Sequence, residues 1–158
     1  MKFIDPNTDP WQFSLDDETQ PSAPRLLLLD DYRELAPTTP GWGLLLDNDV
    51  ELAGLDLRPL RLIALHFPKW TDGRAYTQAW LLRRRYGFRG EIRATGEVLV
   101  DMLPLLARSG FDSVVLSAGQ DEAVARRNLG FFDSVPAPAA YYQGDVSDPR
   151  PLFARIPA

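Results

Sequence analysis

The stretch LIALHFPKWTDGRAYTQAWLLRRRYGFRGEIRA, residues 62–94, decides the fold class. It opens with an apolar run over 62–67, which is typical of a buried strand. Apolar residues then recur at helical spacing over 75–86, and Gly87 ends that pattern. A second strand is predicted at 91–94. Because two parallel strands need a long right-handed connection, the stretch predicts a strand, crossover helix and strand of an α/β fold.

The same alternation extends in both directions along the chain. Further strands are predicted at 26–29, 43–46 and 113–117, and further helices at 97–108 and 121–129. Asp49 is expected to cap a short helical turn, and Pro104 predicts a kink or two shorter helices, since proline inside a helix costs about 3 kcal/mol. We predict a mainly parallel sheet of about five strands, flanked by helices and covered on both faces.

Proline-rich, polar segments frame the predicted domain. The chain has 158 residues and a mass of 17.8 kDa, which suits a single domain. We predict a poorly ordered N-terminal arm over 1–25, an α/β domain over 26–143 and an extended C-terminal tail over 144–158.

Composition excludes several classes of function. The net charge of −5 and the pI near 4.8 argue against nucleic acid or an anionic membrane as the main partner. The chain has no cysteine, which excludes disulfides, zinc–thiolate sites and iron–sulfur clusters. No apolar run approaches the roughly 18 residues of a membrane helix, and no signal region opens the chain, so we expect a cytoplasmic protein. No nucleotide-binding glycine motif occurs and no cofactor is predicted, although a flavin held by scattered contacts stays open.

Two isolated features are weak as catalytic signals. Asp47-Asn48-Asp49 follows a leucine run, like the nucleophile strand of haloacid-dehalogenase-type phosphatases. That chemistry needs a lysine further along the chain to hold the phosphoryl charge, and Lys69 is the only lysine downstream. A helix cap and solvated turn is therefore the simpler interpretation. His66 is the only histidine; a general base and a structural role both stay open. The sequence does not identify a catalytic residue, so catalysis stays open, and we predict no metal site.

Basic residues are concentrated in one part of the chain. Residues 1–60 hold 12 acids and four bases, whereas residues 61–158 hold 10 acids and 13 bases. The triplet 83–85 consists of arginines that fan around a helix, which indicates a solvated face. Arg74 and Arg93 differ, because each lies near the carboxyl end of a predicted strand, where ligands bind in open parallel sheets. They are predicted either to bind one anion together or to pair with nearby carboxylates.

The candidate ligand- or partner-binding residues follow from that edge of the sheet. They lie on the loops after three strands, at 68–74, 95–97 and 117–120, and on the helices that these loops begin. The candidates are Lys69, Asp72, Gly73, Arg74, Tyr76, Arg93, Gly96 and Asp101.

The sequence resembles a bacterial family, domain of unknown function nine-three-four. The resemblance is carried by FPKWTDGRAYTQA at 67–79, LLR at 81–83 and YGFRGEIRATGEVL at 86–99; it continues through Asp101-Met102-Leu103 and Gly110-Phe111-Asp112 to Tyr142-Gln143. It covers about residues 42–143. Thr77 stands where a serine is expected, and Ser109 where many members carry a cysteine.

The resemblance implies a role in sulfite reduction, because members are encoded beside sulfite reductase and sulfate-assimilation enzymes. The chain cannot itself supply the thiolate ligands of a siroheme and iron–sulfur reductase. The resemblance therefore implies an accessory factor whose partner is a sulfite or adenylylsulfate-type reductase, with the segment 72–85 as the contact surface. Two alternatives stay open: an enzyme or sensor that binds a small oxyanion or nucleotide sulfate, and a structural scaffold with no ligand.

Overall fold

The computed structural model describes residues 1–13 and 24–130. Its strands are β1 (Lys2–Phe3), β2 (Gln12–Phe13), β3 (Arg25–Leu27), β4 (Trp42–Leu46), β5 (Leu60–Phe67), β6 (Glu91–Gly96) and β7 (Ser113–Val114). Its helices are α1 (Leu29–Leu35), α2 (Arg74–Arg84), the 3-10 helix η1 (Val100–Met102), α3 (Leu103–Ser109) and α4 (Glu122–Gly130). No helix in this part of the chain is long and apolar enough to cross a membrane.

The strands form one sheet in the order β1-β7-β6-β5-β4-β3-β2, and every neighbouring pair is parallel. The α/β prediction is confirmed. The estimate of about five strands was too low, because β1 and β2 come from the segment that we expected to be a poorly ordered arm. Residues 1–13 pair with both edges of the sheet, whereas residues 14–23 and the tail over 144–158 lie outside the described residues.

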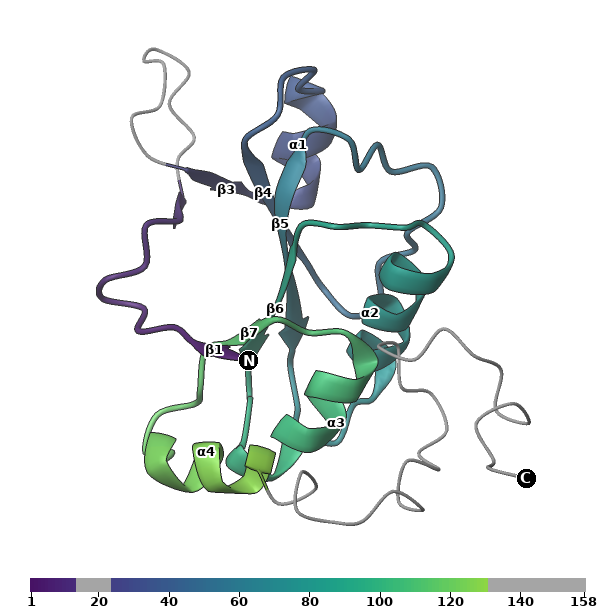
Figure 1. The fold of residues 1–158 in the computed structure, drawn as a ribbon. Coiled ribbons are helices and arrows are strands. Elements are labelled where there is room, and N and C mark those ends of the chain that lie inside the picture. The colour runs from purple at the N-terminus through teal and green to yellow at the C-terminus, as the bar shows by residue number, and fades with distance from the viewer. Residues whose placement is uncertain (14–23, 131–158) are drawn as a thin grey trace, which may run out of the picture.

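The strand order from β3 to β7 runs in one direction without reversing. Right-handed crossovers that all step the same way place their helices on the same face of a sheet. The main core accordingly joins alternate sheet residues such as Leu44, Ile63 and Ile92 to side chains from all four α-helices. In Figure 1, α2 and α3 lie on one side of the central strands, and residues 1–13 run along the other side.

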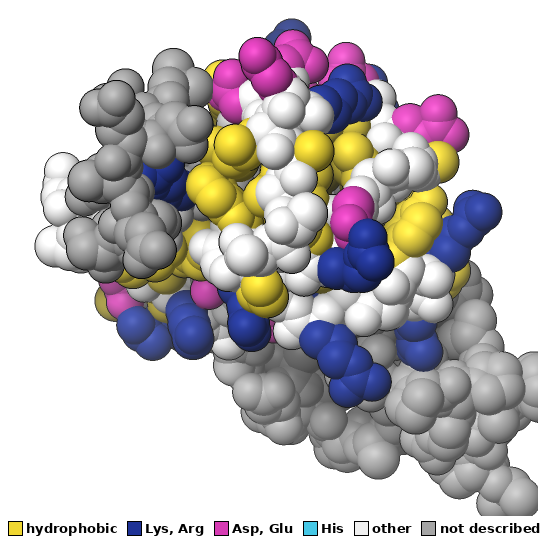
Figure 2. All heavy atoms as spheres, turned by 90° about the horizontal axis from the view of Figure 1, so that it is seen from above, with side chains coloured by type: hydrophobic (Ala, Val, Ile, Leu, Met, Phe, Trp, Pro, Cys, Tyr) yellow, Lys and Arg dark blue, Asp and Glu magenta, His cyan; other side chains and the backbone are white. Residues whose placement is uncertain are grey.

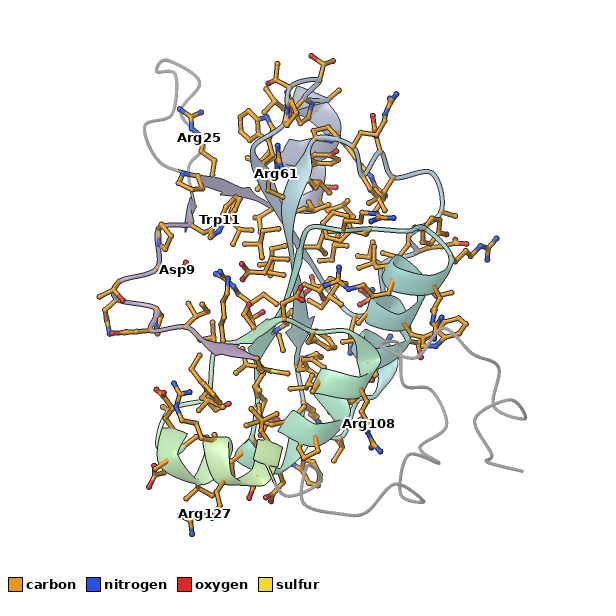
Figure 3. All side chains as sticks on the ribbon, in the orientation of Figure 1. Asp9, Trp11, Arg25, Arg61, Arg108 and Arg127 are labelled. Atoms are coloured by element: carbon orange, nitrogen blue, oxygen red, sulfur yellow. The ribbon has the colours of Figure 1, made fainter. Side chains whose placement is uncertain are left out.

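The second face of the sheet is covered differently from our expectation of helices on both sides. Its apolar cluster consists of Leu26, Leu62 and Ala64, with Trp11 and Leu45 packed against it. Among the described residues, this cover comes from the segment that connects β1 to β2, which we call the N-terminal strap (residues 4–11). Figure 3 shows Trp11 on the strap, on the side away from α2 and α3.

Two local predictions need correction. The leucine run does not stay extended: β3 ends at Leu27, and α1 begins at Leu29 with Asp30 and Asp31 in its first turn, where the helix dipole favours acids. No helical turn forms over 50–53, because the side chain of Gln78 holds the backbone there in a loop. The prediction of two shorter helices within 97–108 is confirmed: the segment forms η1 and α3, with Pro104 in the first turn of α3.

Candidate functional site

The loop between β5 and α2 holds several candidate residues at the carboxyl edge of the sheet. Asp72 accepts hydrogen bonds from the backbone nitrogen of Arg74 at 3.2 Å and from its guanidinium, with an Nη2–Oδ2 distance of 2.8 Å. This side-chain hydrogen bond from Arg74 holds the pKa of Asp72 well below its usual range. On the other side of the loop, the Trp70 nitrogen donates to Glu97 at 3.0 Å. Asp72 and Arg74 therefore hold the loop together.

The remaining candidates near this edge have structural contacts. The ring of Tyr76 packs edge-on against Phe67, with centroids 5.1 Å apart, and burial raises the pKa of Tyr76 to about 12. Asp101 accepts a hydrogen bond from Asn128 at 3.2 Å. Gly96 has a φ of +85°, and a Cβ there would meet the His66 ring at 2.7 Å. The shape of the loop thus requires glycine.

Two further candidates complete the loop. Gly73 is the N-cap of α2 and has no side chain with which to cap the helix. Lys69 is exposed, and its carbonyl accepts a hydrogen bond from the Asp72 nitrogen at 3.0 Å.

Sequence reasoning missed Gln78, which fixes the neighbouring loop. Its amide nitrogen donates to the carbonyls of Asp47 and Val50, both at 2.9 Å. Because Gln78 is buried on α2, these bonds tie the end of β4 to that helix. A glutamine at a core position of a helical pattern was the only signal in the sequence.

Charge at the carboxyl edge disfavours an anion. The loops after β4, β5 and β6, together with the first residue of α2, carry six carboxylates against three cations, and Arg58 and Arg74 are already paired. The acids are Asp47, Asp49, Glu51, Asp56, Asp72 and Glu97, and the cations are Arg58, Lys69 and Arg74. An oxyanion would be repelled by the carboxylates and would have to displace Asp72 from Arg74.

Arg93 lies on the opposite face from α2, so the structure does not bring it together with Arg74. Its side chain is 4% exposed and bonds Asp9 at 2.5 Å and Glu91 at 2.8 Å. Ser113 also donates to Glu91, at 2.5 Å. Burial acts to raise the pKa of Glu91, but the hydrogen bonds from Ser113 and Arg93 outweigh it, and the pKa lies below its ordinary value. Arg93 thus anchors the strap through Asp9, which Figure 3 labels.

The arginine triplet does not form one solvated face. Arg84 and Arg85 are exposed, but Arg83 is half-buried and bonds the backbone around it. Its guanidinium donates to the carbonyls of Phe88 and Gly90, both at 2.8 Å, and to that of Gly110 at 3.0 Å. Arg83 therefore fixes the turn between α2 and β6.

That turn lines a cavity of about 490 Å³ at the amino edge of the sheet, which we call the amino-edge cavity. Its walls are Pro40, Leu57, Arg58, Leu60, Arg61, Tyr86, Gly87, Phe88, Arg89 and Gly90. Sequence reasoning missed it because the rule for open parallel sheets points to the carboxyl edge. The available signal was the segment YGFRG at 86–90, which is among the residues that carry the family resemblance.

Two tryptophans near the candidate loop are exposed. Trp70, in the loop, is 52% exposed, and Trp80, on the outer side of α2, is 42% exposed.

No group of three or more histidine or acidic side chains within residues 1–13 and 24–130 is arranged to hold a metal ion.

The sequence was compared with family models and with curated proteins. The model described as a bacterial protein of unknown function (DUF934) matches residues 43–153. The match thus spans the sheet from β4 to β7, including the candidate loop and all of the amino-edge cavity's lining except Pro40. The comparison with curated proteins gives no match.

Proposed function

Because the chain belongs to the bacterial family DUF934, whose function is unknown, we propose that it is an accessory protein of assimilatory sulfate or sulfite reduction that docks on a reductase. The link to sulfur reduction rests on the resemblance described above and on nothing in the geometry. The geometry supports the second half of the proposal, which concerns docking.

The observation that carries the docking proposal is the exposure of Trp70 and Trp80. Tryptophan is large and apolar, so leaving two half-exposed within eleven residues has a cost in the isolated protein. Tryptophan and arginine are also the residues that contribute most to binding at protein interfaces. Both tryptophans lie on or beside the segment 72–85, which the resemblance implies as the contact surface.

The loop around Trp70 is also suited to docking because it is held in place before a partner arrives. The Trp70 nitrogen is bonded to Glu97, and the next residues are bonded through Asp72 and Arg74. A preorganised surface loses less conformational entropy on binding.

The test is a binding titration between the purified protein and a sulfite reductase holoenzyme, with an adenylylsulfate-type reductase as a second arm. Trp80→Ala is expected to weaken binding at least about tenfold, the loss typical of an interface hot spot. Leu35→Ala is the matched control, because Leu35 is an exposed apolar residue of α1, 41% exposed. Absence of saturable binding to both reductases would overturn the proposal, as would equal losses for Trp80→Ala and Leu35→Ala.

A structural scaffold is a second candidate, favoured by the ion pairs of Asp72 and Arg93. Both residues are paired inside the protein, Arg93 with Asp9 and Glu91 and Asp72 with Arg74. A scaffold predicts that substitution of Asp72 or Arg93 lowers the free energy of unfolding and leaves the affinity for the reductases unchanged. Measuring both quantities on the same variants separates the two candidates.

A further inference from the structure

The amino-edge cavity carries an inference that is independent of reductase docking. We propose that it binds an organic phosphate that bears a flat ring, the chemistry of a nucleoside monophosphate. Its volume of about 490 Å³ lies within the roughly 300 to 1,000 Å³ of small-molecule sites. Its lining combines arginines with apolar and aromatic side chains, which is the combination that such a ligand needs.

The charge of the lining selects an anion. Apart from Tyr86, its ionisable side chains are three arginines, and no carboxylate lines it. Arg58 is paired with Asp56 at 2.7 Å, and its hydrogen bond lowers the pKa of that carboxyl to about 2. Arg61 and Arg89 are exposed and have no carboxylate partner within the described residues. Two guanidiniums in the lining of one cavity offer the charge-assisted donors that a phosphate group accepts.

The position of the arginines also sets the cavity apart from the rest of this acidic protein. Figure 3 places Arg61 near the amino end of β5, well away from Arg108 and Arg127 on the helices. Figure 2 looks onto this end of the molecule; acidic side chains gather toward its upper rim, and the charged side chains in its lower half are mainly Lys and Arg, with a few acids among them. An anion approaching this end meets a local concentration of positive charge.

The apolar part of the wall suits a ring. Leu57 and Leu60 contribute aliphatic surface, and Tyr86 and Phe88 contribute aromatic surface. A flat ring stacks favourably on aromatic side chains and on guanidinium planes. The ring and the phosphate would therefore occupy different parts of the same cavity.

The turn that forms the cavity is rigid before a ligand binds. Arg83 donates to the carbonyls of Phe88 and Gly90, and the Phe88 nitrogen donates to the Leu82 carbonyl at 2.8 Å. At Gly90 the backbone approaches so closely that an added Cβ would lie 2.5 Å from the Phe88 ring and 2.6 Å from the Arg61 carbonyl oxygen. Such a fixed wall reduces the entropy lost on binding.

Isothermal titration of the full chain with adenosine 5′-monophosphate, adenosine and inorganic phosphate tests the proposal. We expect saturable binding of the monophosphate, and weaker binding of adenosine and of phosphate, each of which has only half of the recognised features. Arg61→Ala and Arg89→Ala are each expected to weaken monophosphate binding about tenfold, as the loss of one charge-assisted contact. Arg127→Ala, which removes an exposed arginine from α4, is the matched control.

Three outcomes would overturn the proposal: no saturable binding of the monophosphate, phosphate binding as tightly as the monophosphate, or an equal loss in Arg127→Ala. Thermal unfolding of each variant without ligand verifies that it folds. Reductase binding by Arg61→Ala is expected to equal that of the unmodified protein, so the cavity and the docking surface can fail separately.

Discussion

Among single residues, Arg93 shows most clearly how burial decides a role. The sequence left open whether it binds an anion with Arg74 or pairs with nearby carboxylates; its guanidinium lies on the other face of the sheet, between Asp9 and Glu91. A buried charge is tolerated when its counter-charges are in place, but removing it leaves those counter-charges uncompensated and lowers the free energy of unfolding. The arginine therefore matters for stability, whatever the protein binds elsewhere.

We predict that Arg93→Ala lowers the free energy of unfolding by about 3 kcal/mol at neutral pH, because Asp9 and Glu91 lose their counter-charge. Denaturant unfolding monitored by tryptophan fluorescence measures this change. Arg33→Ala is the control: Arg33 forms an exposed pair with Asp30 at 3.7 Å, and its loss should cost less than about 0.5 kcal/mol. A similar effect of both substitutions would contradict the role given to Arg93.

The lowered pKa of Glu91 predicts a pH dependence. A carboxyl whose pKa is lower in the folded state adds stability above its unfolded pKa, about 4.3, and this stability is lost as the pH falls through the folded value. Glu91→Gln should therefore lower the free energy of unfolding at pH 7, with a smaller difference from the unmodified protein as the pH falls below about 4. Unfolding curves between pH 3 and 7 test this; a difference that stays constant would count against it.

Gly90 is a position where a single added carbon atom, the Cβ of any other residue, would disturb the local structure. A Cβ there would collide with the Arg61 carbonyl and the Phe88 ring. Gly90→Ala should lower the midpoint of thermal unfolding by several degrees, as expected for a loss of about 1 to 3 kcal/mol through overpacking. Gly130→Ala, where nothing lies within 4 Å of an added Cβ, is the control. Equal midpoints for both variants would show that the turn rearranges to accommodate the added Cβ.

Among the elements, the N-terminal strap is the one that sequence patterns did not reveal. It crosses a whole face of the sheet and is attached at Trp11, through an apolar cluster, and at Asp9, through the ion pair with Arg93. These two attachments are of different kinds, and they hold β1 and β2 at opposite edges.

Trp11→Ala should release part of the strap. We expect a loss of roughly 2 kcal/mol in the free energy of unfolding, less than the about 3 to 5 kcal/mol for a fully buried aromatic, because Trp11 is only half-buried. Hydrogen–deuterium exchange should become faster in residues 2–13 and stay unchanged in the central strands β5 and β6. Uniformly faster exchange across the sheet would instead mean that the strap and sheet unfold together.

The elements that sequence reasoning placed well are those with long, regular patterns. The apolar run before Pro68, interrupted only by His66, and the helical spacing after Gly73 located β5 and α2, since a buried strand and a one-sided helix leave distinct periods. The two-residue strands β1 and β2 are too short to show a period. The pairing of Asp9 with Arg93 joins residues 84 positions apart and leaves no trace in either local sequence.

On the scale of the whole molecule, a single direction of strand order explains the arrangement of the candidate sites. Doubly wound sheets have a reversal point where a crevice opens at the carboxyl edge, but β3 to β7 contain no reversal. The loops of the carboxyl edge are instead bonded to one another, and the larger concentration of available arginines lies at the amino edge. The loop rule that guided the sequence analysis assumes a reversal, and for this reason it did not locate the cavity.

The strap has a consequence for the order in which this protein is made. Lys2 pairs with Ser113, and Phe3 with Val114, so during synthesis β1 has no neighbouring strand until more than a hundred further residues have been made. Contacts between such distant positions form late, because closing the loop costs entropy before the contact repays it. The face of the sheet that the strap covers therefore stays open until β7 has formed, and we expect β1 to join the sheet late in folding.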